Sequence, residues 1–404
     1  MTDYSSLSLL GWNDFMERQL TTPGPALTSI VRVCSVHSMV MFVMGATDAT
    51  ESPSATAESH DGTPHSCSGT ARTNIPLPEA AAGIENISPG IHKRQLAIPG
   101  NWLAGDAQAR PTVGDWLVLD PSGQWPERLL ERRTLVIRRA PSDITGVQLV
   151  AANLDTLFIV SSLNEDFNLS RLERYLAIAF ESQVQPVVVL TKADLVTPEY
   201  AQQCAGEVTA LCDDLPVLVV NALDAAAIPL LLPWAGPGQT ATLVGSSGVG
   251  KSTLVNTLSG EERTLTGSIR DADGKGRHTT SSRTLYTLPG GGLIMDVPGF
   301  RELRLPPCEP GLRKVFADVD ALASRCGFSD CQHDGEPQCA VEEAVTSGHL
   351  TRRRVDNYRK LFREQAALDD EKQQAKVYAR QRRAAQRTSG RPSSGKGPKR
   401  RKGH

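Results

Sequence analysis

An eight-residue segment past the middle of the chain has the composition of a phosphate-binding loop. It reads Gly245-Ser-Ser-Gly-Val-Gly-Lys-Ser252, follows the apolar stretch TATLV and opens the helical stretch KSTLVNTLSG. Glycines let backbone N–H groups turn toward phosphate oxygens, the lysine reaches the outer phosphates, and the serine hydroxyl can bind Mg²⁺. The alternative is a glycine-rich turn, and the Lys-Ser pair argues against it. The predicted phosphate-binding residues are Gly245, Ser246, Ser247, Gly248, Val249, Gly250, Lys251, Ser252 and Thr253.

A second segment, Thr191-Lys-Ala-Asp194, could read the purine base. It ends the apolar stretch QPVVVL, where doubly wound sheets place ligand-binding groups. Asp194 can accept from guanine N1–H and the exocyclic amine, whereas adenine presents an acceptor there and leaves the carboxylate unpaired. Alone, this tetrapeptide is common on protein surfaces. With the downstream phosphate loop it predicts guanine binding by Thr191, Lys192, Ala193 and Asp194, with backbone contact from Asn221 and Ala222.

The order of these segments is unusual. The two base-binding segments resemble those of Ras-like GTPases, where they follow the phosphate loop, but here they precede it. GRHTT (276–280) and DVPG (296–299) come afterwards. Asp296 can hold the metal through water and the Gly299 N–H can sense the γ-phosphate, as in GTPase switches. We expect a circularly permuted GTPase domain in which Ser252 binds Mg²⁺ with Thr279 or Thr280.

The group that orients the attacking water is less clear from the sequence. Phe300 follows the DVPG segment where many such enzymes carry a glutamine, and a phenyl ring cannot hydrogen-bond to water. His278 is the nearest candidate catalytic group, although a lone loop histidine is more often an exposed bystander. Lys275 and Arg277 are alternative charge stabilisers.

A cysteine-rich segment predicts a metal site. Its spacing is Cys326-x4-Cys331-x-His333-x5-Cys339, which supplies three thiolates and one imidazole in a short polar loop. Such a closed set of four suits tetrahedral Zn²⁺ and leaves no open position for water, so a structural role is favoured over a catalytic one. Scattered cysteines are the alternative, since the spacing is irregular.

Length and charge set wider limits. A chain of 404 residues is long enough for about two or three domains. The net charge of −2 hides a basic end, because residues 371–404 hold twelve Lys/Arg against one acidic residue, which predicts a polyanionic partner. No stretch approaches the roughly 18 apolar residues of a membrane span, and no signal peptide is evident. We expect a cytoplasmic monomer with no membrane partner.

The combined motifs resemble those of one family, the small ribosomal subunit-dependent GTPases known as RsgA or YjeQ. The similarity runs from about Ser29 to about Gln365 and rests on TKAD, the permuted GSSGVGKS, GRHTT, DVPGF, the segment CGFSDCQHDGEPQCAV and VGDWLVL. It implies a multidomain α/β protein with an N-terminal OB-fold β-barrel, a circularly permuted Ras-like P-loop GTPase domain and a C-terminal helical zinc-binding domain. By this resemblance His278 matches the family's switch histidine. Asn221 departs from the usual serine.

The apolar pattern and the resemblance together predict the domain order. We expect a loose N-terminal extension at 1–25, an OB-fold at 26–136 with a disordered insertion at 45–90, and the permuted G domain at 137–303. A zinc-binding helical domain is predicted at 304–370 and a basic flexible tail at 371–404, although a charged helix is also indicated from about Thr351 to Arg387.

The family resemblance implies one leading function: a ribosome-stimulated GTPase that converts GTP to GDP and phosphate late in maturation of the small ribosomal subunit and binds its rRNA. It implies one structural Zn²⁺ per chain and Mg²⁺ with GTP. An alternative is a GTP-dependent RNA-docking checkpoint in which hydrolysis is incidental; Asp194 disfavours an ATP-dependent enzyme. Two further features are open: Trp102 and Trp116 suit either RNA stacking or a core, and a basic run suits either RNA phosphate or a solvated strand edge. That run comprises Arg132, Arg133, Arg138 and Arg139.

Overall fold

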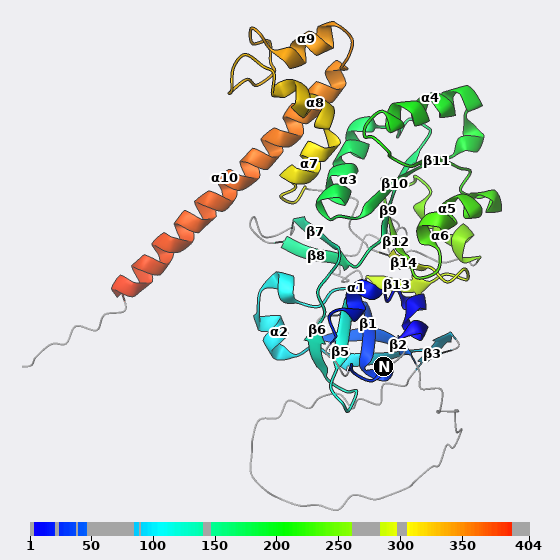
Figure 1. The fold of residues 1–404 in the computed structure, drawn as a ribbon. Coiled ribbons are helices and arrows are strands. Elements are labelled where there is room, and N and C mark those ends of the chain that lie inside the picture. The colour runs from blue at the N-terminus through cyan, green and yellow to red at the C-terminus, as the bar shows by residue number, and fades with distance from the viewer. Residues whose placement is uncertain are drawn as a thin grey trace, which may run out of the picture.

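A computed structural model describes residues 4–20, 24–37, 39–46, 85–88, 90–139, 147–260, 283–296 and 305–389. Figure 1 shows an N-terminal part built mainly of β-strands, a central α/β part and a C-terminal helical part that ends in one long helix. This agrees with the predicted fold class, a multidomain α/β protein whose N-terminal part is a β-sheet and whose central part is a parallel sheet with helices. Among the described residues, no helix is both long and apolar enough to cross a bilayer.

The central part is a parallel sheet covered on both faces. Its parallel strands are β9 (Thr156–Ser162), β10 (Gln185–Thr191), β11 (Val217–Val219), β12 (Thr240–Val244) and β14 (Leu293–Asp296), in the order β11-β10-β9-β12-β14. β13 (Thr284–Thr287) lies antiparallel beside β14. The helices are α3 (Leu169–Glu181), α4 (Pro198–Thr209), α5 (Ile228–Ala235) and α6 (Lys251–Ser259).

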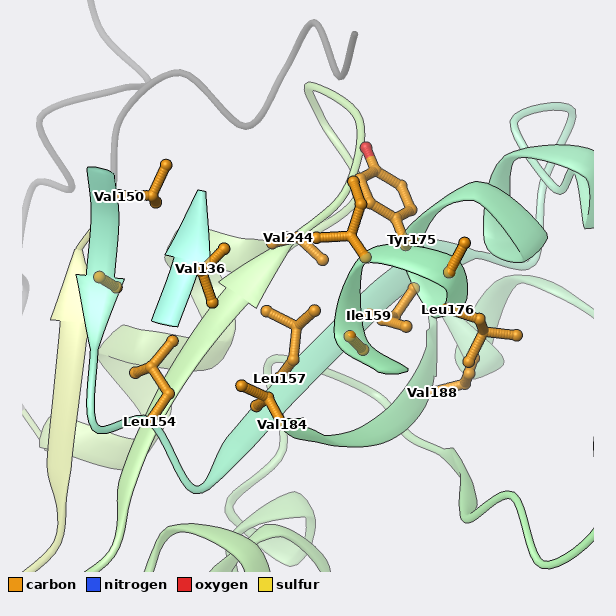
Figure 2. Close-up of a cluster of buried hydrophobic side chains, with 14 of the residues drawn as sticks. Val136, Val150, Leu154, Leu157, Ile159, Tyr175, Leu176, Val184, Val188 and Val244 are labelled. Carbon is orange, nitrogen blue, oxygen red and sulfur yellow. The ribbon is translucent and has the colours of Figure 1, made fainter. Parts of the chain in front are cut away.

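Alternation along β9 explains why helices cover both faces. Leu157 and Ile159 belong to the apolar cluster that includes α3, whereas Phe158 and Val160 belong to a second cluster with α5 and α6. Strands buried on both faces carry near-continuous apolar runs, as in LFIV of β9 and VVVL of β10. Figure 2 shows Ile159 of the sheet beside Leu176 of α3, and Figure 1 shows α3 and α6 on opposite sides of the strands.

The N-terminal sheet is antiparallel. Its strands are β1 (Ile30–His37), β2 (Val40–Ala46), β3 (Glu85–Ser88), β4 (Ile91–Ala97), β5 (Trp116–Leu119) and β6 (Pro126–Leu129), in the order β3-β4-β2-β1-β5-β6. Short helices α2 (Gly100–Ala104) and η3 (Ala107–Ala109) connect β4 to β5. β1 also pairs with β13 at Ser35 and Thr284, which makes this sheet continuous with the central one.

Two expectations about the N-terminal part need correction. The segment expected to be a loose extension folds as η1 (Ser5–Leu10) and α1 (Asp14–Glu17), followed by η2 (Leu27–Ser29), and it buries Leu7 and Leu10 completely. Short turns space apolar residues unevenly, which hides them from a periodicity argument. In the predicted insertion 45–90, the first two residues end β2 and residues 85–88 form β3. Residues 47–84 and 89 lie outside the described part.

Trp116 belongs to the core. It is fully buried, and the ring of Trp12 packs edge-on against it with centroids 5.0 Å apart. Trp102 is half-buried against the β1–β2–β5 core. Stacking on RNA is therefore wrong for Trp116, because its ring has no exposed face.

A buried arginine joins the N-terminal and central parts. The Arg32 guanidinium on β1 donates to the carbonyls of Leu10 (2.5 Å), Gly114 (3.2 Å) and Asn153 (2.9 Å) and to the Thr240 hydroxyl (2.8 Å). Burial lowers the pKa of Arg32 to about 10. These four acceptors lie on four segments, so one cation satisfies buried polar groups from each and fixes the junction.

The C-terminal part is helical. It comprises α7 (Glu309–Val315), α8 (Ala317–Ala323), α9 (Ala340–Thr346) and α10 (Arg352–Ser389). A separate two-stranded sheet, made of β7 (Leu135–Arg139) and β8 (Val147–Ala152), precedes the central sheet in the chain. α10 confirms the predicted charged helix, and it corrects the flexible tail, because the chain is helical through Ser389. Residues 352–389 contain no glycine or proline, so nothing interrupts the helix. Figure 1 shows its distal half extending away from the other elements.

Candidate functional site

The carboxyl ends of the parallel strands bring the predicted nucleotide segments to one edge. Thr191 ends β10 beside Ser162 of β9, and Val244, the residue before the phosphate loop, ends β12 beside Ile159. On the other side of β12, Asp296 ends β14. Parallel strands all end at the same edge of a sheet, which is where open α/β sheets bind ligands.

The phosphate loop has the backbone that its glycines permit. Gly245, Gly248 and Gly250 have φ values of 145°, 77° and 98°, which side-chain-bearing residues rarely adopt. A Cβ at Gly245 would lie 2.2 Å from the carbonyl oxygen of Val160, so no other residue fits there. Gly250 caps α6, and the predicted residues from Lys251 to Thr253 form its first turn. The loop therefore places backbone N–H groups and a helix N-terminus together.

Lys251 folds back over the loop. Its Nζ donates to the carbonyl oxygens of Gly245 at 2.8 Å and Ser246 at 2.5 Å. An ammonium held by two neutral carbonyls can exchange them for phosphate oxygens, whose bonds are charge-assisted and stronger. Ser247 and Gly248 are exposed at the tip, so the loop is open to solvent on that side.

Hydrogen bonds tie the base-reading segments to the phosphate loop. The buried Thr191 hydroxyl donates to the carbonyl oxygen of Val249 at 2.5 Å. On α6, Thr257 donates to the carbonyl oxygen of Ala222 at 2.7 Å. Gly250 lies against both segments, since a Cβ there would stand 3.6 Å from Thr191 Oγ1. Three segments far apart in sequence therefore form one assembly.

The TKAD segment turns sharply at the strand end. Lys192 has φ 61° and ψ 36°, a left-handed conformation, and the Ala193 N–H donates to the carbonyl oxygen of Val220 at 3.3 Å. The turn leaves Asp194 exposed, as an acceptor for a base would have to be. Asn221 is half-buried, and its side chain accepts from the Leu223 N–H at 3.0 Å, which shapes the second segment.

The predicted switch residues fall outside the described part of the chain. They are Lys275, Arg277, His278, Thr279, Thr280, Gly299 and Phe300. Of the predicted magnesium-site residues, the structure describes Ser252, half-buried in the first turn of α6, and Asp296, buried at the end of β14. Ser252 follows β12 through the phosphate loop, and Asp296 ends the neighbouring strand β14. Their hydroxyl and carboxylate are oxygen donors of the kind Mg²⁺ prefers.

The four predicted metal ligands converge in the C-terminal part. Their ligand atoms all lie within 4.8 Å of one another, on Cys326, Cys331, His333 and Cys339. The three sulfurs lie 3.5 to 3.6 Å from His333 Nδ1, and Cys326 Sγ is 3.9 Å from Cys339 Sγ. A tetrahedron with Zn–S and Zn–N bonds of ordinary length has S···N edges of about 3.5 Å and S···S edges of about 3.8 Å. The cluster therefore fits a metal ion of zinc's size.

The loop around this cluster is held by a carboxylate. Glu336 accepts from the N–H groups of Asp334 at 2.6 Å and Gln332 at 2.9 Å. These backbone hydrogen bonds lower the pKa of Glu336 to about 2. His333 itself is buried, has a left-handed φ of 57°, and has a pKa lowered chiefly by burial. A neutral imidazole is the form that binds metal.

The basic run at the domain junction has partners within the chain. Arg132 forms an ion pair with the buried Asp115 at 2.7 Å, and burial raises the pKa of that carboxyl against the opposing effect of Arg132. Arg133 pairs with Asp155, Arg138 donates to Gln148 at 2.8 Å, and Arg139 pairs with Glu371. Each of these arginines therefore has a partner within the chain, and Arg133 is also exposed. Contact of the run with RNA phosphate stays a prediction.

Sequence reasoning missed two sets of residues on α3. Arg171, in its first turn, donates to the Ser246 hydroxyl of the phosphate loop. Two residues on, the fully buried Glu173 accepts from Arg353 and Arg354 of α10, each at distances near 3 Å (3.0 and 2.8 Å). The available signal in the sequence of α3 was a largely apolar helix with charged residues among its apolar positions. Contacts across 180 residues leave no local pattern.

Comparison with known proteins agrees with this arrangement. A family model described as RsgA GTPase matches residues 129–306. A relative named Small ribosomal subunit biogenesis GTPase RsgA 2, from Vibrio vulnificus, is 54% identical over 260 residues, or 64% of this chain and 74% of the relative. The protein named Small ribosomal subunit biogenesis GTPase RsgA from Mesorhizobium japonicum is 47% identical over 252 residues, covering 62% of this chain and 72% of its own. A crystal structure of YjeQ from Thermotoga maritima shares the fold, with a TM-score of 0.54 and 23% identity over 84% of this chain and 98% of that one.

Proposed function

Because the chain belongs to the RsgA family and is therefore a GTP hydrolase, we propose that it is a ribosome-stimulated GTPase acting late in maturation of the small ribosomal subunit. Its partners are GTP, GDP, the small subunit and its rRNA, as the relatives' names suggest for the subunit. It works in the cytoplasm as a monomer. The observation that carries the nucleotide part is the hydrogen bond from Thr191 to Val249, which joins a base-reading segment to a phosphate loop.

Each part of the site has a role in this proposal. The N–H groups of the loop from Gly245 to Gly250 and the N-terminus of α6 hold the phosphates, while Lys251 leaves its two carbonyl partners for the outer phosphates. Asp194 accepts from guanine N–H groups, with Lys192 along the base. Asn221 and Ala222 offer backbone contact to the guanine oxygen. Ala193, Ser252 and Thr253 complete the set.

The metal that accompanies GTP would neutralise charge on the β- and γ-phosphates. Ser252 and Asp296 are its proposed holders among the described residues, with Thr279 or Thr280 completing the set. His278 is proposed to orient the attacking water, because Phe300 cannot, and Gly299 to sense the γ-phosphate. The chain itself binds, orients and surrounds the reacting groups, which is most of what phosphoryl-transfer catalysis requires.

We assign the cysteine cluster a structural zinc ion, one per chain. All four positions of a tetrahedral site are filled by side chains, so none remains for substrate water. The ion would fix the loop between α8 and α9 against α10, where Tyr358 packs on the His333 ring at a centroid distance of 6.1 Å. The site therefore supports docking of the C-terminal part rather than chemistry.

A turnover assay tests this function. GTP hydrolysis should rise when purified small ribosomal subunits are added, and ATP should be hydrolysed far more slowly than GTP at equal concentration. No increase with subunits would refute the ribosomal part of the proposal. Equal turnover of ATP and GTP would refute the assignment of Asp194.

Removal of residues 371–404 should flatten the salt dependence of RNA binding, because each phosphate contact releases counterions.

The residue at position 300 also favours a second candidate function, a GTP-dependent RNA-docking checkpoint. Without a glutamine to orient water, hydrolysis can be slow enough for the GTP-bound form to persist. His278→Ala distinguishes the two functions. Under the checkpoint, the variant still binds particles and their maturation proceeds. Under the enzyme hypothesis, the variant stays trapped on the particle, which sedimentation of GTP-bound complexes would detect.

A further inference from the structure

Arg171 contacts the phosphate loop from outside it. The residue lies in the first turn of α3, after the N-cap Asn168. One guanidinium nitrogen donates both to the Ser246 hydroxyl and to Asp166 Oδ1, the latter at 2.7 Å. The Arg171 side chain is 38% exposed, so it reaches solvent while it contacts the loop. Asp166 thus orients an arginine toward Ser246.

This contact marks the end of the loop that meets the outer phosphates. Lys251, the residue that reaches the β- and γ-phosphates in such loops, rests on the carbonyl oxygen of Ser246 at 2.5 Å. Arg171 binds the hydroxyl of the same serine. Two cations therefore meet at one loop residue, beside the place where negative charge accumulates during hydrolysis.

The helix that carries Arg171 is held on its other side. Glu173 is fully buried and accepts from Arg353 at 3.0 Å and from Arg354 at 2.8 Å. Close backbone approach adds to this, because a Cβ at Gly311 of α7 would lie 2.2 Å from the carbonyl oxygen of Ala177. An arginine presented from a fixed helix loses less conformational entropy when it binds a phosphate than one on a mobile loop.

We propose that Arg171 is a further catalytic residue of the GTP hydrolysis, an arginine supplied in cis. With GTP bound, its guanidinium exchanges the neutral Ser246 hydroxyl for a γ-phosphate oxygen, a charge-assisted contact. The water oxygen bonds to the γ-phosphorus as the bond from that phosphorus to the bridging oxygen breaks. That electron pair stays on GDP; one proton of the water remains on the phosphate product and the other passes to solvent. Arg171 stabilises the charge that shifts between these oxygens.

Arg171→Gln tests this assignment in the full-length protein without ribosomes. The intrinsic kcat should fall by about 100-fold, as when a single charge-stabilising donor is removed. KM for GTP and affinity for GDP should stay within about threefold, since the contact strengthens only in the transition state. Binding of the GDP–aluminium fluoride complex should weaken by about the same factor as kcat. Arg171→Lys should restore part of kcat, because it returns the charge without the planar fork.

Arg174→Gln is the matched control. Arg174 lies on the same helix but pairs with Glu364 of α10 at 2.7 Å, so its loss should leave intrinsic kcat within about twofold. The inference is overturned if Arg171→Gln keeps kcat within twofold of wild type. It is equally overturned if GDP affinity falls as much as kcat, because Arg171 would then only shape the loop. The inference rests on the proposed nucleotide site; a wild-type protein that fails to bind GDP would refute that site instead.

Discussion

The Thr191 hydroxyl donates to the carbonyl oxygen of Val249 at 2.5 Å, and both residues are buried. One lies at the end of the strand before the base-reading turn, and the other lies within the phosphate loop 58 residues later. The bond links the two segments that we propose to meet the two ends of a nucleotide. In a permuted chain, where no short connection joins these segments, such cross-links maintain the site.

Thr191→Val should weaken GDP binding by about tenfold. Valine keeps the shape of threonine but leaves the buried Val249 carbonyl without its donor, a loss of about 1–3 kcal/mol. Calorimetric titration with GDP measures the change. Thr209→Val is the control, because the Thr209 hydroxyl also donates to a carbonyl, that of Ala205, but on the exposed helix α4. Equal affinities for wild type and Thr191→Val would show that the bond does not position the loop.

Asp194→Asn should abolish the preference for guanine. An amide cannot accept from both guanine N–H groups at once. A site built to hydrogen-bond a group discriminates by about 10⁴-fold or more against a partner that lacks the matching group. GDP affinity should drop by at least about 100-fold while the weak affinity for ADP stays constant, as competition binding would report. Asp213→Asn changes another exposed carboxylate outside the segment and should alter neither. Parallel losses of GDP and ADP binding would instead indicate a damaged loop.

Local chemistry made much of the nucleotide edge predictable. The strand expected at TATLV is β12, and the helix expected after it is α6, because glycines, the Lys-Ser pair and an apolar run act within a few residues of one another. The metal-ligand cluster was predictable for the same reason. Spacing along one short loop limits where Cys331 and His333 can lie.

Features that depend on distant contacts were not predictable. The sequence around Trp116 suits either stacking on RNA or a place in the core, and the packing of Trp12 against its ring decides for the core. Leu7 and Leu10 gave no period because a 3-10 turn spaces them. Glutamate is ordinarily an exposed residue, and only α10, 180 residues later, supplies the arginines that pair with the buried Glu173. Each case turns on tertiary burial, which no window of sequence contains.

Glu173→Gln should destabilise the protein by about 3–5 kcal/mol. The side chain of Arg354 is only 7% exposed, and the substitution removes one of its buried charge partners. Breaking a buried ion pair by removing one partner costs about 3–5 kcal/mol of unfolding free energy. The free energy of unfolding in guanidinium measures it. Glu364→Gln removes the half-exposed pair with Arg174 between the same helices and should cost no more than about 1 kcal/mol. Similar losses in both variants would contradict a special role for the buried network.

Metal removal should loosen the loop between α8 and α9 and spare the central sheet. The four ligands are fixed by the ion they would share, and structural zinc sites supply folding free energy directly. Zinc analysis should find one ion per chain in wild type and none in Cys339→Ser, whereas Cys212→Ser, outside the cluster, keeps it. Hydrogen exchange after chelation would locate the change. Protection that stays intact around Cys331 in verified metal-free protein would contradict it.

Glu336→Gln should raise the pH at which acid releases the metal. The pKa of Glu336 is lowered to about 2, so its carboxylate stabilises the folded loop fully above the ordinary value near 4.5 and loses this contribution as the pH falls toward 2. Release itself follows protonation of the thiolates and His333. In wild type the loop around His333 stays formed while these ligands begin to protonate, whereas the glutamine accepts more weakly from the N–H groups of Asp334 and Gln332. A chromogenic chelator followed across the pH range would give both midpoints, with Glu343→Gln, an exposed carboxylate on α9, as control. Coincident midpoints for wild type and Glu336→Gln would mean that the cysteine and histidine ligands alone hold this loop.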